Sequence, residues 1–224
     1  MSQPYTLLLR LEGPMQSWGY RSRFDYRDTA LEPTRSGVIG LICAAMGIAR
    51  GEDIKKFDEI KMGVRVDKEG RPERDYHTAL DVIKADGSGK DTVVSYRDYL
   101  ADTIFTVGLQ SEDLDILNSI EAYLRKPIWP LFLGRKSFCL TEYPLSASRP
   151  AIVQATLEDA LKCASFSLRC KPSKPTEEML NYRLVLEKPD GERTQYDWPL
   201  CFRQRRFKPR SITMLPPQSE GGKE

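Results

Sequence analysis

Residue types that suit general acid–base chemistry occur between Arg74 and Leu100. This stretch contains His77, the single histidine of the chain, with Tyr76 directly before it and Lys90 further along. The unperturbed pKa of a histidine permits proton transfer near neutral pH, and RNA cleavage without a metal needs little more than such a base and an electrostatic stabiliser. One hypothesis is therefore a metal-independent endoribonuclease that uses His77, Tyr76 and a lysine such as Lys90.

The same stretch is equally suited to holding RNA without cutting it. Tyr76 and Tyr96 offer rings on which bases can stack, while Arg74 and Arg97 offer charge for phosphates. His77 can also stack on a base or form a hydrogen bond. The sequence contains no second histidine and no obvious Ser–His or Cys–His unit that would favour catalysis. The residues alone leave both hypotheses open.

A second group of candidate residues lies in the loop PMQSWGYRSRF. This loop alternates aromatic residues with arginines, among them Trp18 and Arg21. Such alternation suits unstacked bases and a phosphate backbone. Trp18 can equally fill the core, because a large aromatic ring is strongly stabilised by burial.

Two further motifs place cations where phosphate is attracted. PTRSG puts Arg35 and Ser36 at the start of a predicted helix, where free N–H groups and the helix dipole attract anions. Simple capping by Ser36 is compatible with this interpretation. LGRKS follows a glycine with Arg135 and Lys136, which suits a phosphate chain, although a plain turn with surface cations would use the same residues.

The composition is that of an ordinary soluble globular protein. The 224 residues are 40% hydrophobic and 29% charged, and the net charge of +2 does not by itself indicate a nucleic-acid partner. Local basic segments such as CFRQRRFKPR (201–210) can still bind phosphates. Five scattered cysteines and one histidine indicate neither a disulfide framework nor a transition-metal site, so we expect no metal and no cofactor. No apolar run is long enough for a membrane span, and the cytoplasm is the simplest expectation.

Hydrophobic periodicity predicts the order β-α-β, a long excursion and a second β-α-β in the first two thirds of the chain. This order is that of a ferredoxin-like fold. The excursion at 68–102 has its own turn, ADGSGKD, and is predicted to be a protruding hairpin, or thumb. The other predicted elements are strands at 5–13, 61–67 and 103–110, helices at 34–50 and 111–127, and a loop followed by a fourth strand within 130–145.

A smaller β-rich part is predicted to follow. A short helix begins in a capping box of Thr156 and Asp159, a hairpin at 181–200 turns at Pro-Asp-Gly, and a final strand covers 202–215. The fold class is therefore α+β. The predicted divisions are a ferredoxin-like domain at 1–148, a C-terminal β-rich extension at 149–216 and a disordered tail at 217–224.

Five motifs, in this order, resemble one known family. They are LLLRLEGPMQSWG, PTRSGVIGLICAAMGI, RDYHT, SYRDYLADTIFTVGL and LGRKSFCLTEYPL. Together they resemble the CasD-type subunits of type I-E Cascade, which belong to the Cas-five family of the RAMP superfamily. The resemblance implies a RAMP- or RRM-like ferredoxin-like domain with a thumb. It also implies a subunit at the foot of a CRISPR RNA-guided surveillance complex for antiviral defence, which caps the 5′ handle of the crRNA.

The same resemblance implies partners and a non-catalytic role. The expected partners are the crRNA, the Cas-seven backbone subunits, the large subunit and, indirectly through the complex, target DNA. Guide processing in this subtype is assigned to a separate Cas-six endoribonuclease. One alternative remains an endoribonuclease that processes CRISPR repeat RNA. Another is an assembly protein whose thumb contacts only other subunits.

Motif position and chemistry together give the expected contacts with the handle. Phosphates are expected at Arg35, Arg135 and Lys136, and splayed nucleotides near Gln16 and Trp18. The complete set of expected RNA-binding residues is Gln16, Trp18, Arg21, Arg35, Ser36, Arg74, Tyr76, His77, Tyr96, Arg97, Arg135 and Lys136.

Overall fold

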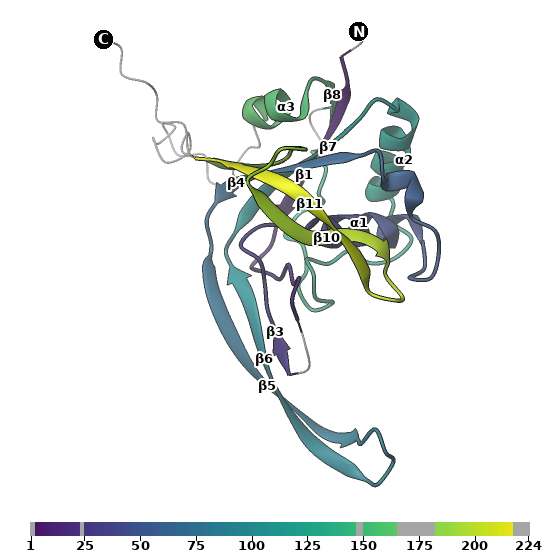
Figure 1. Ribbon diagram of the computed structural model, residues 1–224, viewed down its shortest axis with the longest axis vertical. Helices are drawn as coiled ribbons and strands as arrows, with labels where there is room; N and C mark the ends of the chain where they lie inside the picture. The colour runs from purple at the N-terminus through teal and green to yellow at the C-terminus, as the bar shows by residue number, and fades with distance from the viewer. Residues whose placement is uncertain (1–2, 23–24, 147–149, 165–181, 217–224) are drawn as a thin grey trace, which may run out of the picture.

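Strands dominate this mixed α and β protein, which has three α-helices in its described ranges (Figure 1). The computed structural model describes residues 3–22, 25–146, 150–164 and 182–216, so the predicted disordered tail lies outside it. The elements are β1 (Tyr5–Glu12), β2 (Met15–Gln16), β3 (Tyr26–Arg27), α1 (Arg35–Met46), a 3-10 turn (Lys55–Phe57), β4 (Lys61–Lys68), β5 (Arg71–Ile83), β6 (Lys90–Ala101), β7 (Ile104–Ser111), α2 (Leu114–Arg125), β8 (Ile152–Gln154), α3 (Leu157–Cys163), β9 (Arg183–Glu187), β10 (Arg193–Cys201) and β11 (Arg206–Leu215).

Seven strands form one antiparallel sheet in the order β10-β11-β9-β4-β7-β1-β8. Strand β1, between β7 and β8, is buried along almost its whole length because helices cover both faces of the sheet. Since successive side chains of a strand point to opposite faces, Leu7 and Leu9 join the core cluster that includes α1 and α2. Leu8 instead packs with Leu157 and Leu161 of α3. One apolar run therefore contributes to two hydrophobic clusters.

The helices begin at residues whose side chains accept hydrogen bonds from free backbone N–H groups. Thr34 caps α1 by accepting from the N–H of Gly37, and Thr156 caps α3 by accepting from the N–H of Asp159. Asp113 caps α2 in the same way. The predicted cap at Thr156 is confirmed, while Thr34 rather than Ser36 caps α1. The two predicted helices that follow these caps are confirmed.

The predicted fourth strand within 130–145 is wrong. This segment contains no strand, although it runs beside β1 through isolated bonds from Arg10 N–H to Pro144 O (2.7 Å) and from Thr141 N–H to Glu12 O (2.9 Å). Its prolines and its glycine prevent a regular ladder. The edge position next to β1 is taken by β8.

The predicted hairpin around Pro-Asp-Gly is also wrong, although its two strands exist as β9 and β10. These strands do not pair with each other, because β11 lies between them and pairs with both. The hairpin in this region is formed by β10 and β11 instead. Sequence neighbours fail to pair here because β9 also pairs with β4 on its other side.

The predicted protruding hairpin is formed by β5 and β6, which we call the thumb (residues 71–101). The two strands pair antiparallel from Arg71 opposite Ala101 to Ile83 opposite Lys90. The thumb extends far beyond the seven-stranded sheet (Figure 1). At its base, the short strands β2 and β3 pair with β6, antiparallel and parallel respectively. No helix in the described ranges is long and apolar enough to cross a membrane.

Candidate nucleic-acid interface at the base of the thumb

The strand register gives the base of the thumb two different faces. Tyr76 lies opposite Tyr96, and the next pair along, His77 with Ser95, points to the other side. The sequence motifs RDYHT and SYRDY are thus brought together by strand pairing. Their residues are divided between the two faces rather than gathered at one point.

One face carries three exposed tyrosines, which we call the tyrosine face: Tyr26, Tyr76 and Tyr96. The rings of Tyr76 and Tyr96 meet edge to face at 5.6 Å between centroids. Tyr26 of β3 lies beside Tyr96 in the parallel pairing of β3 with β6. The three residues are 42%, 61% and 45% exposed, so their rings are available to stack on bases.

Arg74 and Asp98 hold the tyrosine face in place. The Nε of Arg74 donates to Asp98 Oδ1 at 2.7 Å, and its Nη2 donates to the Tyr26 hydroxyl at 2.9 Å. That hydroxyl donates in turn to Asp98. The hydrogen bond from Arg74 lowers the pKa of Asp98, while the bond to Asp98 raises the pKa of Tyr26. Arg74 was expected to contact RNA, and here it positions a tyrosine that can do so.

The other face carries a cluster of guanidinium groups from Arg27, Arg97 and Arg135. Arg27 and Arg97 are partners in the register of β3 with β6. Arg135 donates to Asp98 O at 2.6 Å and lies over the ring of Phe138. Burial lowers the pKa of Arg135, and the charges of Arg97 and Arg27 lower it further, while the carboxylates of Asp75 and Asp98 act in the opposite direction. Three neighbouring guanidinium groups suit a phosphate, which accepts hydrogen bonds from several cations at once.

A glycine loop positions Arg135. Gly134 has φ +88°, a left-handed conformation, and a Cβ there would lie 1.6 Å from Ser17 O. Glycine is therefore required at this position. The loop is tied down by the bond from Ser17 N–H to Leu133 O at 3.1 Å. Lys136 follows Arg135 in the chain, and its side chain is exposed.

The geometry does not assemble the three residues of the endoribonuclease hypothesis. Tyr76 and His77 follow one another on β5, so their side chains point to opposite faces. Lys90 lies opposite Ile83, which is about 20 Å beyond His77 at the rise of an extended strand. A general base and its electrostatic partner must lie within hydrogen-bond reach of the same reacting group. His77 and Lys90 do not meet that condition.

Gln16 and Trp18 lie in the core rather than near an RNA surface. Both are fully buried, and the indole Nε1 of Trp18 donates to Gln16 Oε1 at 3.2 Å. The amide of Gln16 donates to Leu11 O and Thr103 O. A Cβ at Gly37 would lie 2.7 Å from the Trp18 ring, so this ring packs tightly on α1. The expectation that these two side chains meet nucleotides is therefore withdrawn, because burial satisfies them internally.

Arg35 is likewise internal, with 1% of its surface exposed. Its guanidinium donates to Ile60 O at 2.6 Å and to Phe57 O at 2.9 Å. It lies 3.7 Å from the centroid of the Trp198 ring. Burial lowers the pKa of Arg35. A phosphate of a bound RNA has no access to this group, and the expected phosphate contact at Arg35 is withdrawn.

The start of α1 does attract an anion, but the anion is a side chain of this protein. The N–H of Arg35 donates to Asp197 Oδ2 at 2.7 Å, and Asp197 is also held by Arg210 at 2.6 Å. Glu187 lies 3.2 Å from the Arg35 guanidinium. Ser36 is half-buried beside this site and contacts the Thr34 hydroxyl. The predicted attraction of the helix terminus for an anion is thus satisfied by β10.

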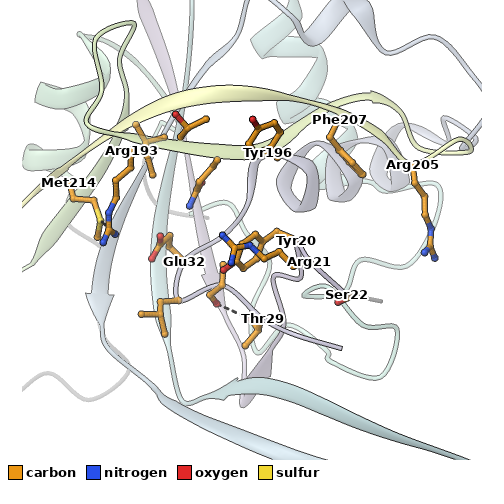
Figure 2. Close-up of a pocket in the computed structure, with 15 residues that line it drawn as sticks. Tyr20, Arg21, Ser22, Thr29, Glu32, Arg193, Tyr196, Arg205, Phe207 and Met214 are labelled. Atoms are coloured by element: carbon orange, nitrogen blue, oxygen red, sulfur yellow. Dashed lines mark hydrogen bonds between the residues drawn. The ribbon is translucent and has the colours of Figure 1, made fainter. Parts of the chain in front are cut away.

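Arg21 lines a groove and belongs to neither face of the thumb base. It is exposed on the wall of a groove between the loop before α1 and the β10–β11 hairpin (Figure 2). Tyr26 and Arg27, in contrast, belong to the interface but were not among the expected contacts. They pair with β6 in a parallel ladder of two residues. No pattern in the neighbouring sequence predicts such a short pairing with a distant strand.

The comparisons with known proteins match this architecture. A family model described as CRISPR-associated protein (Cas_Cas5) matches residues 6–214. The chain belongs to this Cas5 family. This Cas5 protein is 32% identical over 195 residues to the CRISPR system Cascade subunit CasD of Escherichia coli (strain K12), covering 80% of this chain and 77% of that protein. The family resemblance found in the sequence is confirmed.

Two solved structures resemble this Cas5 protein closely. A structure described as a Cas protein is 38% identical, has a TM-score of 0.73 and covers 94% of each chain. A chain of a CRISPR RNA-guided surveillance complex is 33% identical, has a TM-score of 0.79 and covers 95% of this chain and 90% of that one. The Cas5 protein is therefore a homologue of CasD, a Cascade subunit.

Proposed function

We propose that this protein is a non-catalytic subunit of a type I-E Cascade that caps the 5′ handle of the crRNA at the base of its thumb. One observation carries this proposal: an exposed tyrosine face and a cluster of arginines lie on the two sides of the same short hairpin segment. Aromatic rings stack on unpaired bases and guanidinium groups hold phosphates. The homology to CasD supports the crRNA as the ligand.

We propose that β1, α1, β4, β7, α2 and β8 form a ferredoxin-like unit, in which the thumb lies between β4 and β7. The sheet order β4-β7-β1-β8, with every pair antiparallel, supports this assignment. Strands β9, β10 and β11 would then be the smaller C-terminal β-rich part that extends the sheet.

The proposed partners follow from the family. They are the crRNA, Cas-seven backbone subunits and the large subunit, with target DNA reached through the complex in the cytoplasm. The homology to a Cascade subunit supports an assembled complex. The separation of His77 from Lys90 supports a role without catalysis.

Removing the two thumb tyrosines tests the proposal. Tyr76→Ala with Tyr96→Ala should weaken binding of the handle RNA by about 1–3 kcal/mol for each base that loses its stacking partner. The matched control is Tyr123→Ala with Tyr143→Ala, which removes two exposed rings outside the thumb. Affinity is measured by fluorescence anisotropy with labelled handle RNA. Equal affinity of both double variants would sink the assignment of the tyrosine face.

A further inference from the structure

A groove separate from the thumb lies between the loop before α1 and the β10–β11 hairpin (Figure 2). We call it the β10–β11 groove. Its volume is about 1040 Å³, at the upper limit of the roughly 300–1,000 Å³ of small-molecule sites, so it suits an extended ligand better than a single nucleotide. Its aromatic and arginine lining residues are Tyr20, Arg21, Arg193, Tyr196, Arg205 and Phe207. None of its lining residues belongs to the thumb.

The charge of the groove favours an anion. Three arginines line it, and Glu32 is the one acidic residue among its described lining residues. The carboxylate of Glu32 is already paired with Arg183 at 3.2 Å. Among the described lining residues, no unpaired carboxylate therefore offsets the three arginines.

The groove also exposes aromatic rings. Tyr196 is 65% exposed, and Tyr20 and Phe207 are each more than a third exposed. The guanidinium of Arg21 stacks on the ring of Tyr20, with 4.9 Å from its central carbon to the ring centroid. Rings and arginines that alternate along a surface are typical of sites for unpaired bases and their backbone.

Both walls of the groove are held in place. On β10, Tyr196 points outward while the next residue, Asp197, is buried and bonded to the N-terminus of α1 and to Arg210. On the loop, the Asp28 carboxylate accepts from the N–H groups of Tyr20 and Arg21. A preformed groove loses little entropy when a ligand binds.

One residue of the groove has a backbone conformation that its side chain does not favour. Arg205, in the turn of the β10–β11 hairpin, has φ +51°. This left-handed region favours glycine, and a residue with a long side chain there is strained. An arginine at a glycine-like position is consistent with a role for its charge.

From these observations we propose that the β10–β11 groove binds a short stretch of unpaired nucleic acid, at a site distinct from the base of the thumb. The rings would stack on its bases and the arginines would contact its phosphates. RNA and single-stranded DNA share this chemistry. An acidic peptide would use the arginines but would leave the three rings without a partner, so it is the less favoured occupant.

Arg205→Gly provides a sharp test, because it removes the charge and relieves the left-handed strain together. The substitution is made in the Tyr76→Ala, Tyr96→Ala background, so that binding at the thumb does not mask the groove. Twelve-nucleotide oligouridine and oligothymidine, labelled with fluorescein, are the two probes, and they separate RNA from DNA. The matched control, Arg206→Ala, removes the neighbouring charge of the same hairpin, which does not line the groove.

Arg205→Gly should weaken binding of at least one probe about tenfold, with an unchanged or higher melting temperature, while Arg206→Ala should not. Adding Tyr196→Ala to Arg205→Gly should weaken binding of the probe further. Equal affinity of the Arg205→Gly and Arg206→Ala proteins would overturn the proposal. Displacement of both probes by a twelve-residue glutamate peptide at equal concentration would also overturn it, because the groove would then select charge without bases. Failure of the thumb assignment gives a different result: the wild-type protein and the Tyr76→Ala, Tyr96→Ala protein would then bind the handle RNA with equal affinity.

Discussion

At the scale of single residues, aromatic and arginine side chains of the kind that bind RNA are buried at some positions of this protein and exposed at others. Trp18 and Arg35 are the type of residue that binds RNA, yet both are buried and fully engaged within the chain. Tyr76 and Tyr96 have no such internal partners beyond each other and remain exposed. The difference arises from location, because Trp18 packs on α1 and Arg35 begins it, whereas Tyr76 and Tyr96 lie on a hairpin outside the core.

Arg35 is therefore predicted to matter for stability. Arg35→Ala would leave two buried backbone carbonyls without their donor and would leave Glu187 with Arg210, at 3.7 Å, in place of the closer Arg35. Breaking a buried ion pair costs up to about 3–5 kcal/mol. Burial already raises the pKa of Glu187. The measurement is urea denaturation of the purified protein, with Arg21→Ala as an exposed control. Normal stability combined with weak RNA binding would instead make Arg35 a phosphate ligand.

At the scale of elements, the base of the thumb depends on the bond between Arg74 and Asp98. The pKa of Asp98 is lower in the folded protein because Arg74 donates to its carboxylate. A lowered pKa means that the stabilisation is present above the ordinary aspartate pKa of about 4 and is lost as the pH falls through the folded value. The thumb base should therefore loosen in acid.

Asp98→Asn tests this pH dependence. The variant should expose the Tyr96 amide, which donates to Asp25 O at 2.8 Å, more than wild type does above about pH 5. The difference should shrink to nothing in stronger acid, where the wild-type carboxyl is protonated. Hydrogen-exchange protection of that amide, measured from neutral pH downward, is the readout. A constant difference across the whole range would contradict the assignment of Asp98.

The tip of the thumb is predicted to serve assembly rather than handle binding. Leu80 and Ile83 are each 73% exposed there, which is unusual for apolar side chains without a partner. Joining His77 to Ser95, which are partners in the register, through an Asn-Gly turn removes the tip but keeps the tyrosine face. Handle affinity should stay within about twofold, since the stacking residues remain.

The same shortened protein should fail to assemble with the backbone subunits. Size-exclusion chromatography of the reconstituted complex measures assembly, and anisotropy measures handle binding on the same sample. Loss of handle binding with intact assembly would reverse the roles assigned to the base and the tip.

At the scale of the whole molecule, the net charge is small, but positive side chains gather at particular sites on the surface. The net charge is +2, yet the arginines of the thumb base and of the β10–β11 groove form separate positive sites. Other arginines are neutralised in the interior, as with Arg210 against Asp197. A nearly neutral average is thus compatible with strong local attraction for phosphate.

The whole chain should not cleave RNA. Purified protein, end-labelled repeat RNA and excess EDTA should give no discrete product, and His77→Ala should behave as wild type, because Tyr76 points to the other face of β5 and Lys90 lies far along the thumb from His77. A discrete cut that disappears in the variant would restore the endoribonuclease alternative.

Local patterns in the sequence determined much of this protein. Periodicity and capping residues predicted the three helices, the strands β1, β4 and β7 and the protruding thumb, since each depends on residues close together in the chain. The motifs also predicted the family, which the comparisons confirmed. Tyr76 and Tyr96 were among the predicted contacts and are exposed as a binding role requires.

Tertiary structure alone decided which candidate residues reach the surface. Arg35 and Ser36 begin a helix that could bind an outside anion, but Asp197 of β10, far away in sequence, occupies that position. Tyr26 joins the tyrosine face through a parallel pairing with β6, and β11 separates two strands that are neighbours in sequence. Such long-range pairings are set by the packing of the whole sheet, because a short stretch of sequence carries no information about which distant strand will cover it.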